Sequence, residues 1–248
     1  MVTVAVPYHL DRRLDGFDVG IPFDREVTAE LPSGGPWARM AVLYQQVAET
    51  VSSQTSPSLV VSGDCTASLG VLAGLQRAGH DVGIVWFDAH PDFHTEDTTT
   101  SGYLGGMPLA LAAGVGALTL PTALGLRPVP GTRIVLVDAR DTDAGEHVLL
   151  EQSEVTRANV ADLRDVDLPE GDLYLHVDLD VCDPGDVPDL LYPTPGGPAL
   201  DDVLDAVQRV VARGGVAAIG LAATWQHDTS TTAAQRLVMR RLLAATRG

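Results

Sequence analysis

Cysteines, aromatic residues and long apolar runs are scarce in this sequence of 248 residues. Its two cysteines, Cys65 and Cys182, have no CxxC spacing and provide no disulfide framework, which indicates a reducing compartment. No apolar run approaches the ~18 residues of a membrane-spanning helix. The N-terminal apolar run is too short for a signal peptide, and no basic region precedes it. We therefore expect a cytoplasmic protein without a membrane partner.

Basic residues are also few, 16 against 33 acidic residues, which gives a formal net charge of −17. A chain this acidic repels phosphate backbones, so nucleic acid is not expected as a partner. Most of the acidic side chains are expected on the solvated surface. In contrast, apolar residues make up 45% of the chain, which is enough for the core of one large domain. We expect a single domain over residues 1–248.

Two kinds of segment alternate along the chain. Short runs rich in β-branched residues predict strands, and several are apolar on both faces, as parallel strands covered by helices are. Amphipathic segments between them predict helices. The alternation predicts a mostly parallel sheet with helices on both faces. The predicted strands are residues 2–6, 59–62, 84–87, 133–138, 174–178 and 216–220, and the predicted helices are residues 37–52, 66–78, 107–113, 200–212 and 231–245.

Glycine and proline mark the ends of some of these segments. Gly79 follows the predicted helix 66–78, at the position just past a helix end where glycine is favoured. The stretch 120–131 holds three prolines and two glycines, and we interpret it as a connection.

Acidic side chains follow three of the predicted strands. Ligands of open parallel sheets bind beyond the carboxyl ends of the strands. Residues i, i+2 and i+4 of an extended chain point the same way, so we expect the side chains at these strand ends to converge. They are Asp88, His90 and Asp92 after strand 84–87, Asp178 and Asp180 at the end of strand 174–178, and Asp64 and Cys65 after strand 59–62.

This convergence predicts a metal centre. Four crowded carboxylates would repel one another and some would protonate, whereas divalent cations remove the repulsion. Carboxylates together with imidazole suit Mn, Fe, Co or Zn. A single DxHxD segment could instead be a polar strand end, but two acidic strand ends in one sheet favour metal. Four carboxylates exceed the needs of one cation, and two metals about 3.5 Å apart can hold a bridging hydroxide as the nucleophile.

At these motifs the sequence resembles the arginase, or ureohydrolase, family, and the resemblance extends over most of the chain. The order and spacing of the blocks make it specific. It implies a three-layer α/β/α fold, one catalytic domain over residues 1–248, and a binuclear manganese hydrolase of guanidine or amidine C–N bonds. The blocks are Asp88-Ala-His90-Pro-Asp92, Asp178-Leu-Asp180 with Asp183-Pro184, and the segments 101–108, 140–147 and 194–197.

The resemblance also implies a ligand set for two divalent metal ions. Asp88 and Asp178 would each bridge both metals. Asp92 would bind the first metal only, whereas His90 and Asp180 would bind the second only. Manganese is the expected metal.

The first strand end departs from the family pattern, because Cys65 stands where the family has a histidine ligand of the first metal. A thiolate is a reasonable replacement that is softer and adds a negative charge, so the metal preference would shift toward Zn or Fe. Some family members that hydrolyse N-hydroxyarginine also carry cysteine here. The alternative is that Cys65 is a small buried apolar residue and that one metal is lost.

Two further departures concern the substrate pocket. Tyr103 replaces a family asparagine, and Gly105 replaces a histidine that is thought to shuttle protons. Ala222 or Ala223 stands where the family has a glutamate that pairs with the guanidinium group. An unpaired buried guanidinium would be costly, so plain arginine or agmatine is not the expected substrate.

Other side chains could take over the missing functions. His94, two residues past Asp92, is predicted to supply acid–base catalysis, and His227 is a second candidate. Tyr103 and Trp225 are predicted to form an aromatic wall for a less charged substrate. For the two histidines the alternative is a satisfied or surface side chain, and for the aromatic residues it is ordinary packing.

Together these residues predict a hydrolase of an amidino or modified guanidino amino-acid-like compound, such as N-hydroxyarginine. Asp143 matches a family residue that contacts the substrate α-amino group, and Ser101 matches one near the substrate carboxylate. Asp92 or Asp180 would orient the bridging hydroxide by hydrogen bonding. The alternative is a metal-binding family member that does not hydrolyse and acts as a partner or regulatory protein. The resemblance also implies a homo-oligomer.

Overall fold

The computed structural model of the chain describes residues 1–225 and 231–247. Within these residues the main sheet has eight strands, and every neighbouring pair runs parallel. The strand order is β4-β1-β5-β10-β9-β6-β7-β8. The strands are β1 (Val2–Val6), β4 (Arg25–Glu26), β5 (Ser58–Ser62), β6 (Gly83–Asp88), β7 (Ile134–Asp138), β8 (Thr156–Ala158), β9 (Leu173–Asp178) and β10 (Val216–Ala222), and β2 (Tyr8–His9) pairs with β3 (Arg12–Arg13) in a separate antiparallel ribbon.

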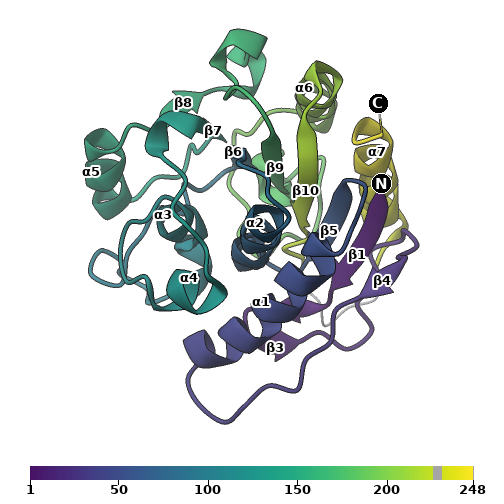
Figure 1. Cartoon of the computed structure of the whole chain (residues 1–248). Coiled ribbons are helices and arrows are strands. Elements are labelled where there is room, and N and C mark those ends of the chain that lie inside the picture. The colour runs from purple at the N-terminus through teal and green to yellow at the C-terminus, as the bar shows by residue number, and fades with distance from the viewer. Residues whose placement is uncertain (226–230, 248) are drawn as a thin grey trace.

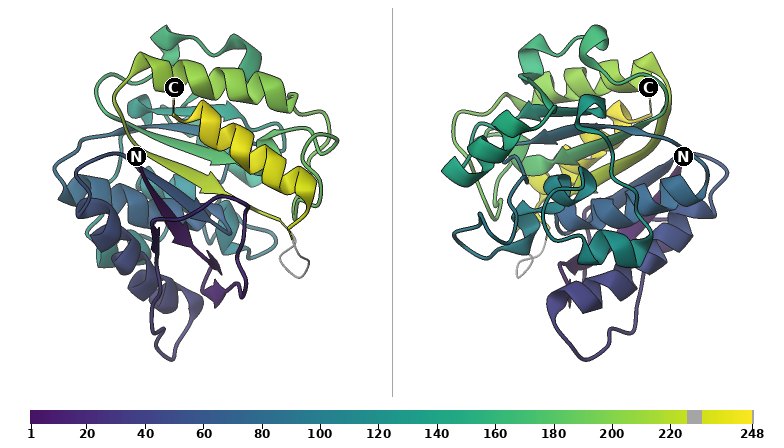
Figure 2. Two further views of the ribbon diagram at one scale, coloured as in Figure 1. Left: turned by 90° about the vertical axis from the view of Figure 1, so that its right-hand side faces the viewer. Right: turned by 60° about the vertical axis from the view of Figure 1, so that its left-hand side comes forward.

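Helices cover both faces of this sheet (Figures 1 and 2). The helices α1 to α5 pack on one face, and α6 and α7 pack on the other. They are α1 (Pro36–Ser52), α2 (Ser68–Arg77), α3 (Pro108–Ala112), α4 (Thr119–Leu124), α5 (Ala144–Gln152), α6 (Leu200–Arg213) and α7 (Ala233–Ala245). The structure therefore confirms the three-layer α/β/α fold.

Successive residues of a central strand pack into two separate hydrophobic cores, one on each face of the sheet. On β6, Ile84 and Trp86 pack with α1 to α5, whereas Val85 and Phe87 pack with α6 and α7. Both sets are fully buried, which explains why the strand is apolar at every position until Asp88. Because strands buried on both faces leave no solvated position, polar side chains are confined to the strand ends.

The predicted strands and long helices are confirmed, with ends that differ by one or two residues. Gly79 has φ +91° and follows α2, as predicted. The stretch 120–131 was interpreted as a connection, and this is wrong in its first part, because α4 occupies Thr119–Leu124. Pro121 is tolerated because it lies in the first turn, where backbone N–H groups have no partner within the helix. Gly125, with φ +66°, ends that helix.

Helix α5 was not predicted, although its start carries a local signal. Asp143 is the N-cap residue, and its side chain and that of Glu146 form a capping box. No helix among the described residues is both long and apolar enough to cross a bilayer.

Candidate metal centre

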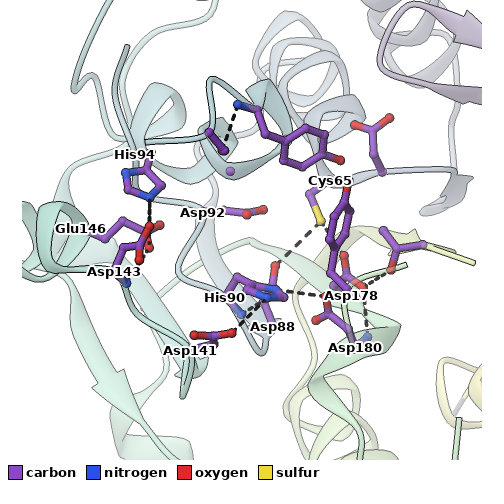
Figure 3. A pocket seen from close by; sticks show the side chains of 17 residues that line it. Cys65, Asp88, His90, Asp92, His94, Asp141, Asp143, Glu146, Asp178 and Asp180 are labelled. Atoms are coloured by element: carbon purple, nitrogen blue, oxygen red, sulfur yellow. Dashed lines mark hydrogen bonds and ion pairs between the residues drawn. The ribbon is translucent and has the colours of Figure 1, made fainter. Parts of the chain in front are cut away.

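A cavity of about 220 Å³ opens at the carboxyl ends of β5, β6 and β9 (Figure 3). It gathers nearly every polar residue that the strand-end pattern singled out. Its described lining consists of Asp64, Cys65, Asp88, His90, Asp92, His94, Ser101, Tyr103, Gly105, Gly106, Asp141, Asp143, Glu146, Asp178, Asp180, Tyr192 and Thr224.

Asp88, His90 and Asp92 converge as predicted, but not by extended alternation. Strand β6 ends at Asp88, whose Oδ1 accepts a hydrogen bond of 2.7 Å from the His90 backbone N–H. Asp92 has φ +51°, the left-handed region that few residues other than glycine adopt. The chain therefore turns sharply after the strand, and a local turn rather than strand periodicity brings Asp92 into the cavity.

The second acidic strand end uses a similar turn. A single 3₁₀ turn, Leu179–Val181, follows β9, and Asp178 Oδ1 caps it by accepting from the Asp180 backbone N–H at 3.0 Å. The same oxygen accepts from Thr224 Oγ1 at 2.7 Å. Asp180 Oδ1 accepts from the Ala89 backbone N–H at 3.2 Å, which ties the two strand ends together.

His90 is the cation that these carboxylates share within the protein. Its Nδ1 lies 3.1 Å from Asp180 Oδ2 and 3.5 Å from Asp88 Oδ1. Burial lowers the pKa of His90, but the hydrogen bonds to Asp180 and Asp88 outweigh it and raise the pKa to about 12. Without a metal, His90 is therefore an imidazolium.

One imidazolium does not neutralise four buried carboxylates. Burial, and then repulsion by neighbouring carboxylates, raises the pKa of Asp178 and of Asp180 to about 7. Burial and the charge of Asp88 raise the pKa of Asp92 well above its ordinary value, and Asp92 Oδ2 has no hydrogen-bond partner among the residues that the structure describes. A buried carboxylate oxygen without a partner is costly in a protein interior. This residue set fits divalent cations, which bind carboxylate oxygens together with imidazole.

Cys65 lies among these carboxylates. Its Sγ is 2.8 Å from Asp178 Oδ2 and 3.8 Å from Asp88 Oδ2. Burial, and then the charges of Asp178 and its neighbours, raises the pKa of the Cys65 thiol well above its usual range. In the metal-free chain the thiol therefore stays protonated and donates to Asp178. The contact supports a ligand position for Cys65 rather than simple apolar packing.

His94 lies at one wall of the cavity and is paired on both ring nitrogens. Its Nε2 is 3.1 Å from Asp143 Oδ2 and 3.6 Å from Glu146 Oε2, and its Nδ1 is 3.1 Å from Thr98 Oγ1. Glu146 was not predicted as a site residue. It accepts hydrogen bonds from the backbone N–H groups of Phe93 and Asp143, so it holds this wall in place.

Tyr103 and Ser101 line the cavity, as predicted. The Tyr103 hydroxyl is 3.1 Å from His9 Nε2, and its ring lies 5.2 Å from the ring of Tyr192. Ser101 is exposed at the rim, where its Oγ accepts from the Tyr103 backbone N–H. His9 and Tyr192 were not predicted, because they belong to segments far from every acidic strand end.

Several predicted residues do not reach the cavity. Trp225 is 3% exposed and packs in the core against α6 and α7, so its placement does not support a role in substrate binding. Ala222 and Ala223 are buried and do not line the cavity either; Thr224 does, and it was not predicted. His227 lies outside the described residues.

A last polar residue lies beneath the cavity floor. His176 is on β9, two residues before Asp178, and is 1% exposed. Burial lowers the pKa of His176 to about 3, so its ring is neutral. No sequence pattern singles His176 out, because it lies in the interior of a predicted strand.

Comparisons with known proteins show the family to which the chain is similar. The model of the arginase family matches residues 15–243. An arginase of Bacillus subtilis is 32% identical over 169 residues, and an N(omega)-hydroxy-L-arginine amidinohydrolase of Streptomyces lavendulae is 33% identical over 162 residues. Each match covers 62% of this chain and 56% of the relative, so the chain matches little more than half the length of either.

The fold comparison extends over the whole chain. A solved arginase from Bacillus cereus superimposes with a TM-score of 0.84 at 21% sequence identity, covering 100% of this chain and 98% of that one. At this identity the likeness shows a shared fold.

Proposed function

The chain belongs to the arginase family, and from this premise we propose that it is a metal-dependent amidinohydrolase that cleaves a C–N bond in a small molecule. The observation that carries the proposal is the group of buried carboxylates at the strand ends, where, within residues 1–225 and 231–247, one imidazolium faces four acids and an Asp92 oxygen has no partner. Such a group is costly to bury without divalent cations.

We assign two metal ions to the cavity. Asp88 and Asp178 would contact both ions, Asp92 would hold the first, and His90 and Asp180 would hold the second. Cys65 would be a further ligand of the first ion, as its contact with Asp178 supports. Manganese is our first assignment, with zinc or iron as alternatives because thiolate favours softer ions.

The metal ions, when bound, supply a water molecule that deprotonates near neutral pH. Asp92 and Asp180, each of which would hold a single ion, would orient the attacking water by hydrogen bonding. His94 would act as the general acid–base group. It lines the cavity and is held between Asp143 and Thr98 by bonds of 3.1 Å, which fixes the ring orientation that proton transfer requires.

The cavity wall favours an amino-acid-like substrate with a modified distal group. Asp143 and Ser101 lie at the rim, where they would contact the amino-acid head. Tyr103 and Thr224 offer hydroxyl groups to the cavity, and Thr224, the described lining residue just past β10, carries no carboxylate to pair with a guanidinium. A hydroxylated guanidine such as N-hydroxyarginine meets these conditions, and the similarity to the Streptomyces amidinohydrolase supports it.

Elemental analysis combined with a substrate panel tests the proposal. The purified chain should bind about two metal ions and release hydroxyurea and ornithine from N-hydroxyarginine faster than it releases urea from arginine or agmatine. Bound metal without turnover on a broad amidine panel would favour the alternative, a non-hydrolytic partner or regulatory protein. A chain that binds no divalent ion would overturn both.

The cytoplasmic location and the homo-oligomeric state stay predictions. Light scattering on the purified chain tests the second of them, and cell fractionation tests the first.

A further inference from the structure

The imidazole of His176 is held rigidly beneath the floor of the cavity. In the sheet, Trp86 of β6 and Gly220 of β10 are its lateral neighbours. Its ring stacks on the Trp86 indole with 3.7 Å between the ring centroids. A Cβ at Gly220 would lie 2.1 Å from the Tyr174 hydroxyl and 3.2 Å from His176 Nδ1, so only glycine leaves room for these polar groups.

One nitrogen of this ring has a partner and the other has none. Tyr174 Oη donates to Ser68 Oγ at 2.7 Å, and Ser68 Oγ lies 3.0 Å from His176 Nδ1. His176 Nε2 is buried and has no hydrogen-bond partner among the described residues. A histidine that served packing alone would leave this polar atom unsatisfied, which interiors rarely tolerate.

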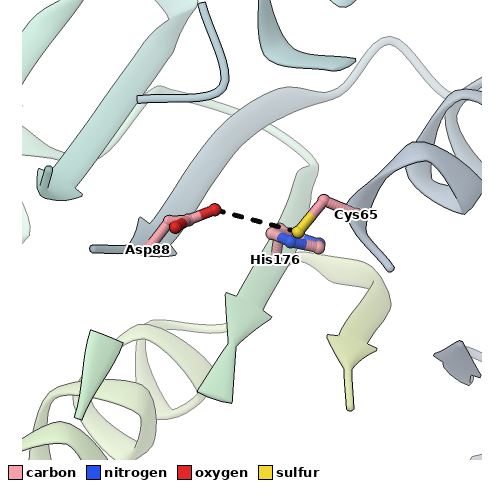
Figure 4. Close-up of side chains that lie close together, drawn as sticks. All are labelled: Cys65, Asp88 and His176. Atoms are coloured by element: carbon pink, nitrogen blue, oxygen red, sulfur yellow. Dashed lines mark hydrogen bonds between the residues drawn. The ribbon is translucent and has the colours of Figure 1, made fainter. Parts of the chain in front are cut away.

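The ring lies beside two groups of the metal centre. A ring nitrogen of His176, Cys65 Sγ and an Asp88 carboxylate oxygen all lie within 4.8 Å of one another. Figure 4 shows the three side chains gathered at one place. Zn–S bonds of about 2.3 Å and Zn–N bonds of about 2.0 Å place ligand atoms roughly 3.3–3.6 Å apart around one tetrahedral ion, which falls within this limit. All three side chains are buried, and they come from three different segments: the turn after β5, β6 and β9.

We propose that His176 is a metal ligand, and that it completes a buried sulfur–nitrogen–oxygen site with Cys65 and Asp88. The inference rests on the proposed metal centre and extends it by one ligand that lies below the cavity. Ser68 would then accept from His176 Nδ1–H and fix the tautomer that leaves Nε2 free for the ion, as partners of ligating histidines commonly do.

This ligand set changes the expected metal. Thiolate and imidazole favour zinc or iron(II), whereas oxygen-rich sites suit manganese. The His90–Asp180 side of the centre, which carries no sulfur, would keep the preference for manganese. We therefore expect the two sites of one centre to prefer different metals. The site of Cys65, Asp88 and His176 would prefer zinc, and the His90–Asp180 side would prefer manganese.

The number of coordinated histidines tests the inference on the unmodified chain. We would load the ¹⁵N-histidine-labelled full-length protein with ¹¹³Cd²⁺ and detect scalar coupling between cadmium and ring nitrogens by NMR. Two coupled histidines, His90 and His176, are expected. A single coupled histidine with cysteine still bound to cadmium would overturn the inference and leave the metal centre intact.

A variant pair provides a second readout. His176→Gln should weaken Zn²⁺ binding by at least about 100-fold, because loss of even an outer partner of a ligand costs roughly 10- to 100-fold. His147→Gln, the same change at an exposed position on α5, should leave Zn²⁺ binding unchanged. Unchanged Zn²⁺ affinity in a folded His176→Gln would contradict the inference.

Different results would overturn the proposed hydrolase function and the proposed ligand role of His176. Absence of turnover on every amidine tested, with two coupled histidines present, would overturn the proposed function and keep this site. If His176→Gln does not fold, the count of coupled histidines in the unmodified chain still decides the inference.

Discussion

The ring of Tyr103 occupies the space that a side chain at position 105 would need. A Cβ built on Gly105 would lie 2.3 Å from both Cε1 and Cζ of Tyr103. The two departures from the family pattern therefore depend on each other, because a large ring at position 103 requires glycine at position 105. Tyr103 keeps its place through its hydroxyl contact with His9 and its ring contact with Tyr192.

This relationship predicts that substitutions at the two positions are coupled. Gly105→Ala alone should displace the Tyr103 ring and cost about 1–3 kcal/mol of unfolding free energy, as overpacking does. In a Tyr103→Asn background the same change should cost much less, with a coupling energy of roughly 0.5–3 kcal/mol. Chemical denaturation of the four metal-saturated proteins measures the cycle. If the two changes in unfolding free energy simply add, the Tyr103 ring moves away from a side chain at position 105 without cost, and the predicted coupling is wrong.

A second prediction concerns the protons released when metal binds. Ligands must be deprotonated to bind a cation, and burial raises the pKa of the Cys65 thiol well above its usual range. Zinc binding should therefore expel the thiol proton. Cys65→Ser should release about one proton fewer, as calorimetry in buffers of different ionisation enthalpy would show. Cys182→Ser is the matched control, because Cys182 is buried in the core and does not line the cavity.

A third prediction is that the stability of the metal-free chain falls as pH rises. Burial and like charges raise the pKa of Asp178 and Asp180 to about 7 in the folded chain, against about 3.9 for an unperturbed Asp. The folded state then binds more protons than the unfolded state between these values. The stability contributed by the protonated Asp178 and Asp180 is fully present below about pH 4 and is lost as pH rises through 7. For each group the free energy of unfolding falls by at most about 1.4 kcal/mol per pH unit.

Thermal unfolding in chelator from pH 5 to pH 8 measures this slope. His90, whose paired carboxylates raise its pKa to about 12 despite burial, loses its contribution only above pH 6.5 and so adds to the decline there. Saturating metal should flatten the curve, because the carboxylates are then ionised and paired. Asp178→Asn should also flatten it in chelator. A metal-free chain as stable at pH 8 as at pH 5 would contradict the account.

The fold could be predicted from sequence because the central strands are apolar on both faces. Ile84 to Phe87 show this, since adjacent residues face different helix layers and none is solvated. Helix α4 was missed because its proline and glycine are typical of loops, although both are compatible with a helix at its first turn and its end.

The convergence of the candidate metal ligands could be predicted because these residues follow strands directly, so their approximate place depends on local sequence alone. The turn at Asp92 could not, because its positive φ is imposed by the surroundings. His176 and Thr224 were missed for another reason. The place of His176 depends on its proximity to Cys65 and Asp88, and that of Thr224 on its hydrogen bond to Asp178. These partners belong to other segments of the chain, so local sequence spacing does not reveal them.

The last prediction concerns the separate roles of His94 in catalysis and Asp143 in substrate binding. Because Asp143 is exposed at the rim and His94 is held behind it, Asp143 should serve substrate binding and His94 proton transfer. His94→Gln should lower kcat by about 100-fold with little change in KM, since positioned acid–base groups contribute about 10²–10⁴-fold. Asp143→Asn should instead raise KM and lower kcat only slightly. Steady-state kinetics on N-hydroxyarginine separates the two effects, with His147→Gln as the control. Full kcat in His94→Gln would transfer the acid–base role to another group, and equal losses of kcat in both variants would mean that the His94–Asp143 pair acts as a single catalytic unit.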